Sequence, residues 1–256
     1  MLVRPYTAPV RVDLALLPPD HLPAGRTCVV VDVLRATSTI TVLLGRGLSA
    51  VYPAASVAEG RALRERLEQV LGRTVGLLGE TGALTPPGYD LGNSPHELSR
   101  VPLPWREAVL ATTNGTPALL ACADAPLTLA AAPLNAGAVA RAAVEAGRDV
   151  LVVCAGTDGI ASEDDALAAG LIIARLAQHG AQLTSEAGRA AQDYGQARGD
   201  LAAALGATSH GRRLRELGFA HDLAYCAAED QFEVAGALRA WAEGSMLRPL
   251  PGWSAA

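Results

Sequence analysis

Short runs of consecutive hydrophobic residues alternate along this chain with longer segments whose hydrophobic residues recur every three or four positions. The runs have the length of strands buried on both faces, and they include TCVVVDV at 27–33, EAVLATT at 107–113, LTLAAAP at 127–133 and DVLVVCAG at 149–156. The longer segments predict helices, among them 38–46, 56–71, 135–147 and 163–179. Strands that alternate with helices indicate an α/β fold, in which a mainly parallel sheet carries helices on both faces.

The whole chain, residues 1–256, is expected to form a single α/β domain, because no segment has the composition of a linker between domains. Half of the residues are hydrophobic, which is enough for a large core. Residues 185–243 predict a mostly helical C-terminal part of the same domain, with room for one late strand at LAYCA (223–227).

Charge and hydropathy exclude several classes of protein. The net charge is −5 and no basic run is longer than Arg212–Arg213, so we expect no nucleic-acid partner. We expect no membrane association, because no hydrophobic stretch reaches the roughly 18 residues of a membrane span and the N-terminal MLVRPYTAPV lacks the core of a signal peptide. Four widely spaced cysteines are typical of buried thiols in a reducing compartment, so a cytoplasmic location is expected.

Polar and glycine-containing stretches follow four of the predicted strands. They are DVLRATST at 32–39, GETGALTPPGYDLGNSP at 79–95, TTNGTP at 112–117 and CAGTDGIASEDD at 154–165. Ligands of such sheets bind beyond the carboxyl ends of the strands, so these stretches are expected to form one site.

The residue types in these stretches suit a phosphate group. Helix N-termini offer free N–H groups, a glycine in NGTP lets the backbone approach an anion, and Arg35 adds a bidentate cation. All 21 basic residues are arginine, so no lysine is present to share this work. Asp32 and the acids at 163–165 would repel phosphate unless a divalent cation lay between them, and Mg²⁺ prefers such oxygen ligands. The sequence therefore predicts metal-assisted phosphate chemistry.

Each stretch also has a plain structural interpretation. The hydroxyls at 37–39 suit a helix cap, NGT at 114–116 suits a turn, and SEDD at 162–165 suits a helix start. His96 is expected in a solvent-facing loop and Cys154 in the core. Only the coincidence of several stretches at one edge of the sheet favours a site.

Several motifs together resemble the 2-phosphosulfolactate phosphatase family. They are VVVDVLRATSTI, GYDLGNSPHE, ATTNGTPAL, LNAGAVA, VCAGTDGIASEDDALAAG and SHGRRLRELGFAHDLAYCA, in the same order over about residues 13–234. The resemblance implies a three-layer α/β/α fold and an Mg²⁺-dependent phosphoric monoester hydrolase. The family reaction converts 2-phospho-3-sulfolactate into 3-sulfolactate and phosphate, a step towards coenzyme M.

The resemblance also assigns roles to particular residues. Catalytic roles fall to Asp32, Arg35 and Asn114, and Mg²⁺ ligands are expected among Asp32, Glu163 and Asp164. The residues expected to bind substrate are Thr37, Asn93, Ser94, Thr113, Gly115, Thr116 and Gly156.

One position departs from the family pattern. The family has Gly-Glu-Arg after the fourth strand, whereas this chain has Thr81 after Gly79 and Glu80. An arginine there is a natural partner for one anionic group of the substrate, and Arg100 or Arg106 could take its place.

The expected partner is a small anionic phosphorylated substrate, and a homodimer remains open. The nucleophile expected first is a water molecule activated by the metal, followed by Asp32 and then by Cys154. Two alternatives stay open: a phosphatase for a different phosphorylated hydroxy acid, and a non-catalytic domain that binds a phosphometabolite. A nucleotide-binding enzyme is disfavoured, because the chain has neither GxGxxG after its first strand nor GxxxxGK[ST].

Overall fold

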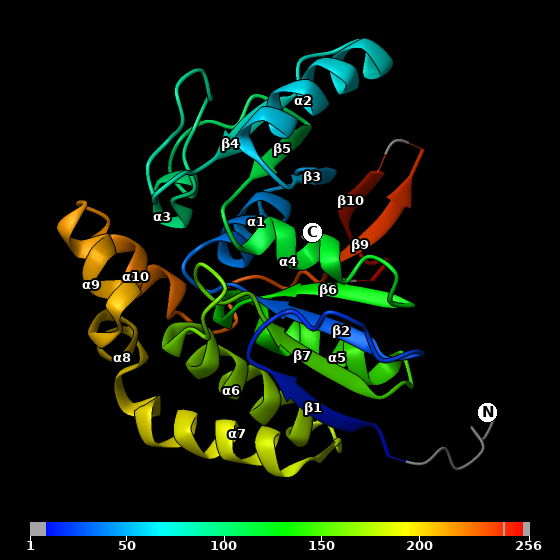
Figure 1. Ribbon diagram of the computed structural model, residues 1–256, viewed down its shortest axis with the longest axis vertical. Helices are drawn as coiled ribbons and strands as arrows, with labels where there is room; N and C mark the ends of the chain where they lie inside the picture. Colours follow the sequence, from blue (N-terminus) through cyan, green and yellow to red (C-terminus); the bar gives the residue numbers. More distant parts are fainter. Residues whose placement is uncertain (1–8, 243, 253–256) are drawn as a thin grey trace.

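The computed structural model describes residues 9–242 and 244–252 (Figure 1). Its strands are β1 (Arg11–Ala15), β2 (Thr27–Val31), β3 (Ala50–Ala54), β4 (Gly76–Gly79), β5 (Glu107–Ala111), β6 (Leu127–Ala131), β7 (Val150–Cys154), β8 (Gln182–Leu183), β9 (Gly236–Trp241) and β10 (Gly244–Pro249). Its α-helices are α1 (Ala36–Gly45), α2 (Val57–Leu71), α3 (Pro95–Leu98), α4 (Gly115–Ala121), α5 (Ala136–Glu145), α6 (Glu163–Gln178), α7 (Ser185–Ala197), α8 (Leu201–Ala207), α9 (Ser209–Glu216) and α10 (Ala220–Cys226). Two short 3₁₀ turns lie at η1 (Pro133–Asn135) and η2 (Arg198–Asp200).

The strands form one mixed sheet in the order β4-β5-β3-β10-β9-β6-β2-β7-β1-β8. Two groups of strands are parallel within themselves, β4-β5-β3 and β6-β2-β7-β1-β8, and the antiparallel hairpin β9–β10 lies between them. The predicted α/β class and the mainly parallel sheet are confirmed.

The hairpin reverses the direction of one group relative to the other. Three antiparallel pairs separate β3 from β6, so β3, β5 and β4 run opposite to β6, β2 and β7. The accumulated twist of neighbouring strands turns the groups relative to each other, and Figure 1 shows them strongly inclined. The carboxyl ends of both groups can therefore approach the same region of the molecule.

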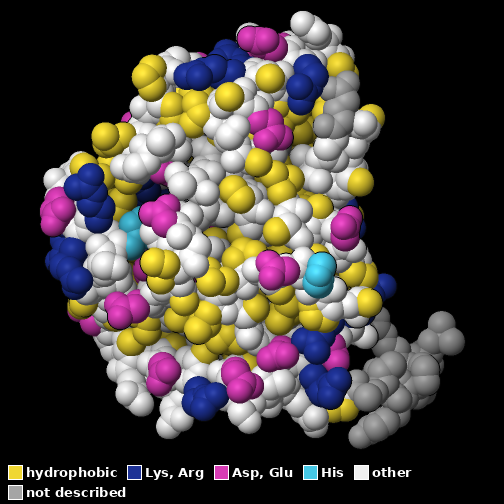
Figure 2. Space-filling model, in the orientation of Figure 1, with side chains coloured by type: hydrophobic (Ala, Val, Ile, Leu, Met, Phe, Trp, Pro, Cys, Tyr) yellow, Lys and Arg dark blue, Asp and Glu magenta, His cyan; other side chains and the backbone are white. Residues whose placement is uncertain are grey.

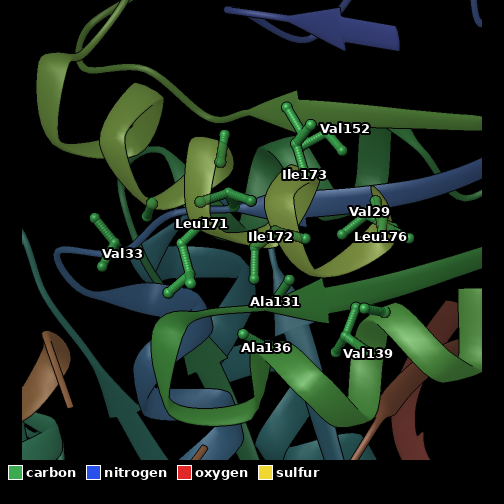
Figure 3. Close-up of a cluster of buried hydrophobic side chains, with 14 of the residues drawn as sticks. Val29, Val33, Ala131, Ala136, Val139, Val152, Leu171, Ile172, Ile173 and Leu176 are labelled. Carbon is green, nitrogen blue, oxygen red and sulfur yellow. The ribbon is translucent and has the colours of Figure 1, made fainter. Parts of the chain in front are cut away.

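The central strands are buried on both faces, as their continuous hydrophobic runs predict. Val29 and Val31 of β2 belong to one hydrophobic cluster, and Cys28 and Val30 belong to another. Figure 3 shows the first cluster, in which side chains from β2, β6 and β7 pack against α5 and α6. Helices α1 and α4 contribute to the second cluster, so helices cover both faces of this part of the sheet.

Most of the described residues in the C-terminal part, 185–243, are helical. Helices α7 to α10 lie in it, but the late strand expected at 223–227 was wrong, because these residues close α10. Leu223 and Cys226 are three positions apart and both are buried, which is the spacing of a helical face. The strand instead begins at Gly236, where an added Cβ atom would push against the end of the Leu44 side chain. Among the described residues, no helix is long and apolar enough to cross a membrane.

The hairpin generates a prediction about stability. Leu247 in β10 is fully buried and lies opposite Val51 on one side and Leu238 on the other. Leu247→Ala should lower the free energy of unfolding by about 2–5 kcal/mol, because it leaves a cavity where the strand groups join. Val70→Ala, at a position 60% exposed, is the control and should change it by less than about 0.5 kcal/mol. Equal denaturation midpoints for the two variants would contradict this role of the hairpin.

Candidate active site

A cavity of about 310 Å³ lies where the segments after β2, β4, β5 and β7 meet α9. Pockets for small molecules have this size or more. The lining side chains come mostly from the polar stretches that follow the strands: Asp32, Leu34, Arg35, Glu80, Thr81, Gly82, Ala83, Asn93, Thr113, Asn114, Thr157, Asp158, His210 and Arg213. The structure therefore brings together the four strand ends that the sequence predicts to form one site.

Asp32 directly follows β2 and lines the cavity, although only 7% of the residue is exposed to solvent. Its Oδ1 accepts a hydrogen bond from the Ala36 N–H at 3.2 Å, and its own N–H donates to Thr37 Oγ1 at 3.0 Å. Burial raises the pKa of Asp32 to about 6, with the charges of Glu80 and Asp164 adding to the shift and those of His210 and the Ala36 hydrogen bond opposing it. Asp32 is thus a buried acid among other acids.

Gly115, at the start of α4, lets the backbone pass close to this carboxylate. A Cβ atom at position 115 would overlap Asp32 Oδ2 and the Ala36 Cβ. Any larger residue would therefore displace Asp32. Its predicted approach to a bound phosphate stays a prediction, and the group that Gly115 approaches in the structure is the Asp32 carboxylate.

Glu80 is a site residue that the sequence analysis did not single out. It follows β4 and lines the cavity, where its Oε1 accepts from the Thr113 N–H and its Oε2 from the Ala83 N–H, both at 2.8 Å. The carboxylate thus ties two cavity loops together. The signal available in the sequence was an acid at the end of a predicted strand, the same signal that identified Asp32.

Two short turns contribute to the cavity wall. Residues 81–84 and 157–160 each close a two-residue turn, with left-handed backbone at Ala83 (φ 71°) and at Asp158 (φ 51°). The Asp158 N–H donates to Asn114 Oδ1 at 3.1 Å, which fixes the side chain of this predicted catalytic residue in the cavity.

Arg35 lines the cavity, but its guanidinium group is already engaged. Its side chain is 2% exposed; Nη1 lies 3.0 Å from Asp222 Oδ2, and Nη2 donates to the Ala83 carbonyl at 2.7 Å. The group also stacks over the ring of Phe219 at 4.4 Å. The structure gives Arg35 a role in holding α10 and the 81–84 turn, and contact with a phosphate stays a prediction.

The acids that start α6 separate into different surroundings. Glu163 is exposed and lines a second cavity, of about 790 Å³, between β1, α6, α7 and α8, so the structure does not bring it to Asp32. Asp164 is buried, and its carboxylate receives the Ser162 hydroxyl at 2.5 Å and faces His210 Nδ1 at 3.2 Å. Asp165 accepts the N–H groups of Val33 and Gly156.

Figure 2 shows the surface of the molecule in the orientation of Figure 1. Hydrophobic side chains gather in its lower half, where Figure 1 draws β1, α6 and α7. Leu14, Leu16 and Leu167 line the second cavity there.

Like charges close together affect the pKa of Asp165. Burial raises the pKa of Asp165 well above its usual value, and the charges of Asp32 and Asp164 raise it further. The N–H groups that Asp165 accepts oppose the shift. The three acids therefore form one electrostatic unit around the end of β2.

His210 is the second residue that the sequence analysis missed. It lies on α9 and lines the cavity, with Nδ1 facing Asp164. Burial alone would lower the pKa of His210, but the hydrogen bond and charge of Asp164, together with the charge of Asp32, outweigh it and raise the pKa. His210 lies 46 residues after Asp164 in the chain. No pattern near His210 in the sequence predicts this contact, because only the fold brings the two residues together.

Several residues predicted to bind substrate form the frame of the cavity instead of its lining. Thr37 and Thr116 are fully buried, and their hydroxyls donate to the carbonyls of Asp32 and Ala54. Ser94 caps α3 and donates to Asp222. The N–H of Gly156 is held by Asp165.

Asn93 and Thr113 do line the cavity. Thr113 is exposed there, and its N–H is held by Glu80. Asn93 is only 4% exposed, and its Oδ1 is a buried polar atom without a hydrogen-bond partner in the structure.

Three residues considered from the sequence lie away from the cavity lining. Cys154 is fully buried, and burial together with the nearby charges of Asp165 and Asp164 raises the pKa of its thiol well above the usual value, which disfavours a thiolate nucleophile. Arg106 lines a separate cavity beside Glu107, and Arg100 contacts the ring of His96. Neither arginine takes a place in the cavity wall beside Thr81.

The comparisons with known proteins fit this geometry. A family model described as 2-phosphosulpholactate phosphatase matches residues 14–240. The chain belongs to this family. A probable 2-phosphosulfolactate phosphatase of Deinococcus radiodurans is 40% identical over 220 residues, covering 85% of this chain and 89% of that protein. Probable 2-phosphosulfolactate phosphatases of Thermotoga petrophila and Thermus thermophilus are 38% and 36% identical, covering 87% and 85% of this chain and 93% and 90% of those proteins.

The raised pKa of Asp32 generates a prediction about stability and pH. Its pKa rises from 3.8 to about 6 on folding. Ionising Asp32 therefore costs more free energy in the folded state than in the unfolded state. The penalty grows as pH rises through this window and then stays constant, at about 3 kcal/mol. In EDTA, Asp32→Asn should therefore raise the melting temperature at pH 8 and have little effect near pH 4. A melting temperature that is lowered at pH 8 would contradict the burial penalty.

The close approach at Gly115 generates a second prediction for this family of enzymes. Gly115→Ala should lower kcat/KM by about 100-fold or more for the substrate proposed below, because the new methyl group moves the Asp32 carboxylate. Gly188→Ala is the control, since a Cβ atom at that helical position meets nothing within 4 Å. Far-UV circular dichroism should show both variants folded. Full activity in Gly115→Ala would mean that the position of Asp32 is not critical.

Proposed function

We propose that this chain is a phosphatase that hydrolyses the phosphate monoester of a small hydroxy acid, most specifically 2-phospho-3-sulfolactate to 3-sulfolactate and phosphate. The observation that carries the proposal is the pair of carboxylates, Asp32 and Glu80, that line one cavity at the carboxyl ends of the strands. The names of the relatives support the substrate, and the cavity volume suits a molecule of this size.

The residues of the cavity fit a Mg²⁺ ion. Asp32 and Glu80 offer carboxylate oxygens, and Asn93 adds an amide oxygen that has no hydrogen-bond partner. Among the described residues, no three His, Cys, Asp or Glu side chains are grouped to hold a metal ion by themselves. Mg²⁺ commonly takes one or two carboxylates and fills its other positions with water and substrate phosphate. When bound, the ion would supply positive charge opposite the phosphoryl oxygens.

His210 and Asp164 are proposed to handle the proton of the leaving group. Asp164 faces Nδ1, so it orients the ring and stabilises its charged form. His210 can then give a proton to the ester oxygen that leaves as the hydroxyl of the hydroxy acid. Asp164 contacts Ser162 and His210 and is not among the residues that line the cavity, which favours this orienting role over the metal-binding role expected from the sequence.

Asn114 and the turns at 81–84 and 157–160 are proposed to orient the substrate. Asn114 is held by Asp158, and the first turn is held by Glu80 and Arg35. These contacts leave few mobile side chains around the phosphate, which lowers the entropic cost of reaching the transition state. Water remains the proposed nucleophile.

We also propose a three-layer fold and a cytoplasmic location. A three-layer α/β/α arrangement is supported by the two hydrophobic clusters on opposite faces of β2. A cytoplasmic location is supported by the four cysteines, which are free and buried.

The test is phosphate release from 2-phospho-3-sulfolactate, with and without EDTA. Turnover should be lost in excess EDTA and return when Mg²⁺ is added back. Glu80→Gln should raise the Mg²⁺ concentration needed for half-maximal activity by about 10-fold or more, the size of effect seen when one ligand's support is lost. Full turnover in EDTA would contradict the metal.

Glu163→Gln is the matched comparison for Glu80→Gln. Its carboxylate lines the other cavity, so its Mg²⁺ dependence should equal that of the unmodified protein. A larger effect at Glu163 than at Glu80 would restore Glu163 as the metal ligand and overturn the assignment made from the structure.

A further inference from the structure

We infer that Arg213 binds the acid group, carboxylate or sulfonate, that the substrate carries beside its phosphate, and so sets the preference for phosphorylated hydroxy acids. This inference rests on the proposed phosphatase function. Asp32, Glu80 and Asp158 line it with negative charge, and a substrate with two or more anionic groups needs a cation that is free to turn towards it.

Three basic side chains line the cavity, and two of them are committed to buried acids. Arg35 is paired with Asp222, whose side chain is 1% exposed. His210 faces Asp164, whose side chain is 3% exposed. Both pairs are internal to the protein, so each positive charge is already balanced. A second anion of a substrate would gain little from either group.

Arg213 has a different environment. Its side chain is 60% exposed although it lines the cavity, which places it at the mouth. It forms an ion pair with Glu216, which is 3.7 Å away and 68% exposed, and exposed ion pairs contribute little to stability. The guanidinium group can therefore leave Glu216 for a ligand at little cost. Its fork of N–H groups matches two oxygens of a carboxylate or sulfonate.

The helix that carries Arg213 is held firmly in place. His210 and Arg213 are three positions apart on α9 and both line the cavity, so one face of the helix serves the site. Thr208 caps the helix, and its hydroxyl oxygen accepts the Gly211 N–H at 3.0 Å. Leu214, the residue after Arg213, is fully buried in the hydrophobic core and anchors the helix there. The backbone is thus positioned while the end of the arginine side chain is free to meet a ligand.

The proposal places the ends of the substrate. The phosphate would lie near Asp32 and Glu80, and the second acid group would point towards α9 at the mouth. Such a site favours esters of hydroxy acids over esters of neutral alcohols. The shared chemistry of carboxylate and sulfonate is what Arg213 recognises, and the choice of substrates in the test separates the two.

The experiment compares three esters with Mg²⁺ present: 2-phospho-3-sulfolactate, 2-phospholactate, which lacks the sulfonate, and isopropyl phosphate, which lacks both acid groups. Arg213→Gln should lower kcat/KM for the first ester by about 10- to 100-fold, mainly through KM, because a charge-assisted contact is lost. Isopropyl phosphate should change by less than about 2-fold, since it never made the contact. An equal loss for 2-phospholactate identifies the carboxylate as the partner, and a much smaller one identifies the sulfonate.

Two further variants test the geometry and the fold. Arg213→Lys keeps the charge without the fork and should recover part of the loss. Arg212→Gln removes the neighbouring arginine, which is exposed and contacts the Ala207 carbonyl, and it should match the unmodified protein with all three esters. Equal melting temperatures show that Arg213→Gln is folded. An equal loss for all three esters, or no loss for any, overturns the inference.

Calorimetric titration with 3-sulfolactate separates this inference from the proposed function. The dissociation constant should rise about 10-fold or more in Arg213→Gln, whether or not the protein turns over the ester. Binding that depends on Arg213 without hydrolysis would refute the phosphatase and keep the role of Arg213. If hydrolysis and binding are both unchanged in Arg213→Gln, the role of Arg213 is refuted and the phosphatase function is kept.

Discussion

The hydrogen bonds of the β9–β10 hairpin hold this molecule together as a single sheet. The hairpin pairs with β6 on one side and β3 on the other, and without it two groups of parallel strands would share no edge. Because it reverses the direction of one group, the sheet must twist strongly for both sets of carboxyl ends to meet. Asp32 after β2 and Glu80 after β4 come from opposite groups, so the cavity exists only in the joined sheet.

The cavity concentrates negative charge where solvent is scarce. Asp32, Asp164 and Asp165 lie in one electrostatic unit, and burial raises the pKa of Asp32 and Asp165. Such an arrangement costs stability, and a protein keeps it when a bound cation or a substrate balances the charge. The backbone packs closely against this charge at Gly115, where a larger residue would overlap the Asp32 carboxylate.

Much of the fold could be predicted from the sequence because its strands are buried on both faces. TCVVV and VLVVC are continuous hydrophobic runs with glycine and polar residues beyond their ends, and each forms a strand inside the sheet. The strands at 236–241 and 244–249 were missed. GALRAW mixes small, basic and aromatic residues, since only half of it is buried, and the partners that make it a strand lie far away in the chain.

The site was predictable where it depends on local position and not where it depends on tertiary contacts. Asp32, Asn93, Thr113 and Asn114 follow strands and line the cavity, as expected. Neighbours in one motif can still separate, because successive residues at a helix start point in different directions: Glu163 faces solvent and Asp164 faces His210. The partner of Arg35 lies 187 residues away, and no pattern near Arg35 announces it.

The position of the hairpin in the chain has a consequence for biosynthesis. Residues 236–249 leave the ribosome after every other strand of the sheet, so β3 and β6 are exposed edges of two incomplete sheets for most of translation. Open edges of hydrophobic strands are the places where polypeptides pair wrongly with one another. The nascent chain therefore passes through a stage at which it can associate with its neighbours on the polysome, and only the arrival of β9 and β10 closes both edges at once.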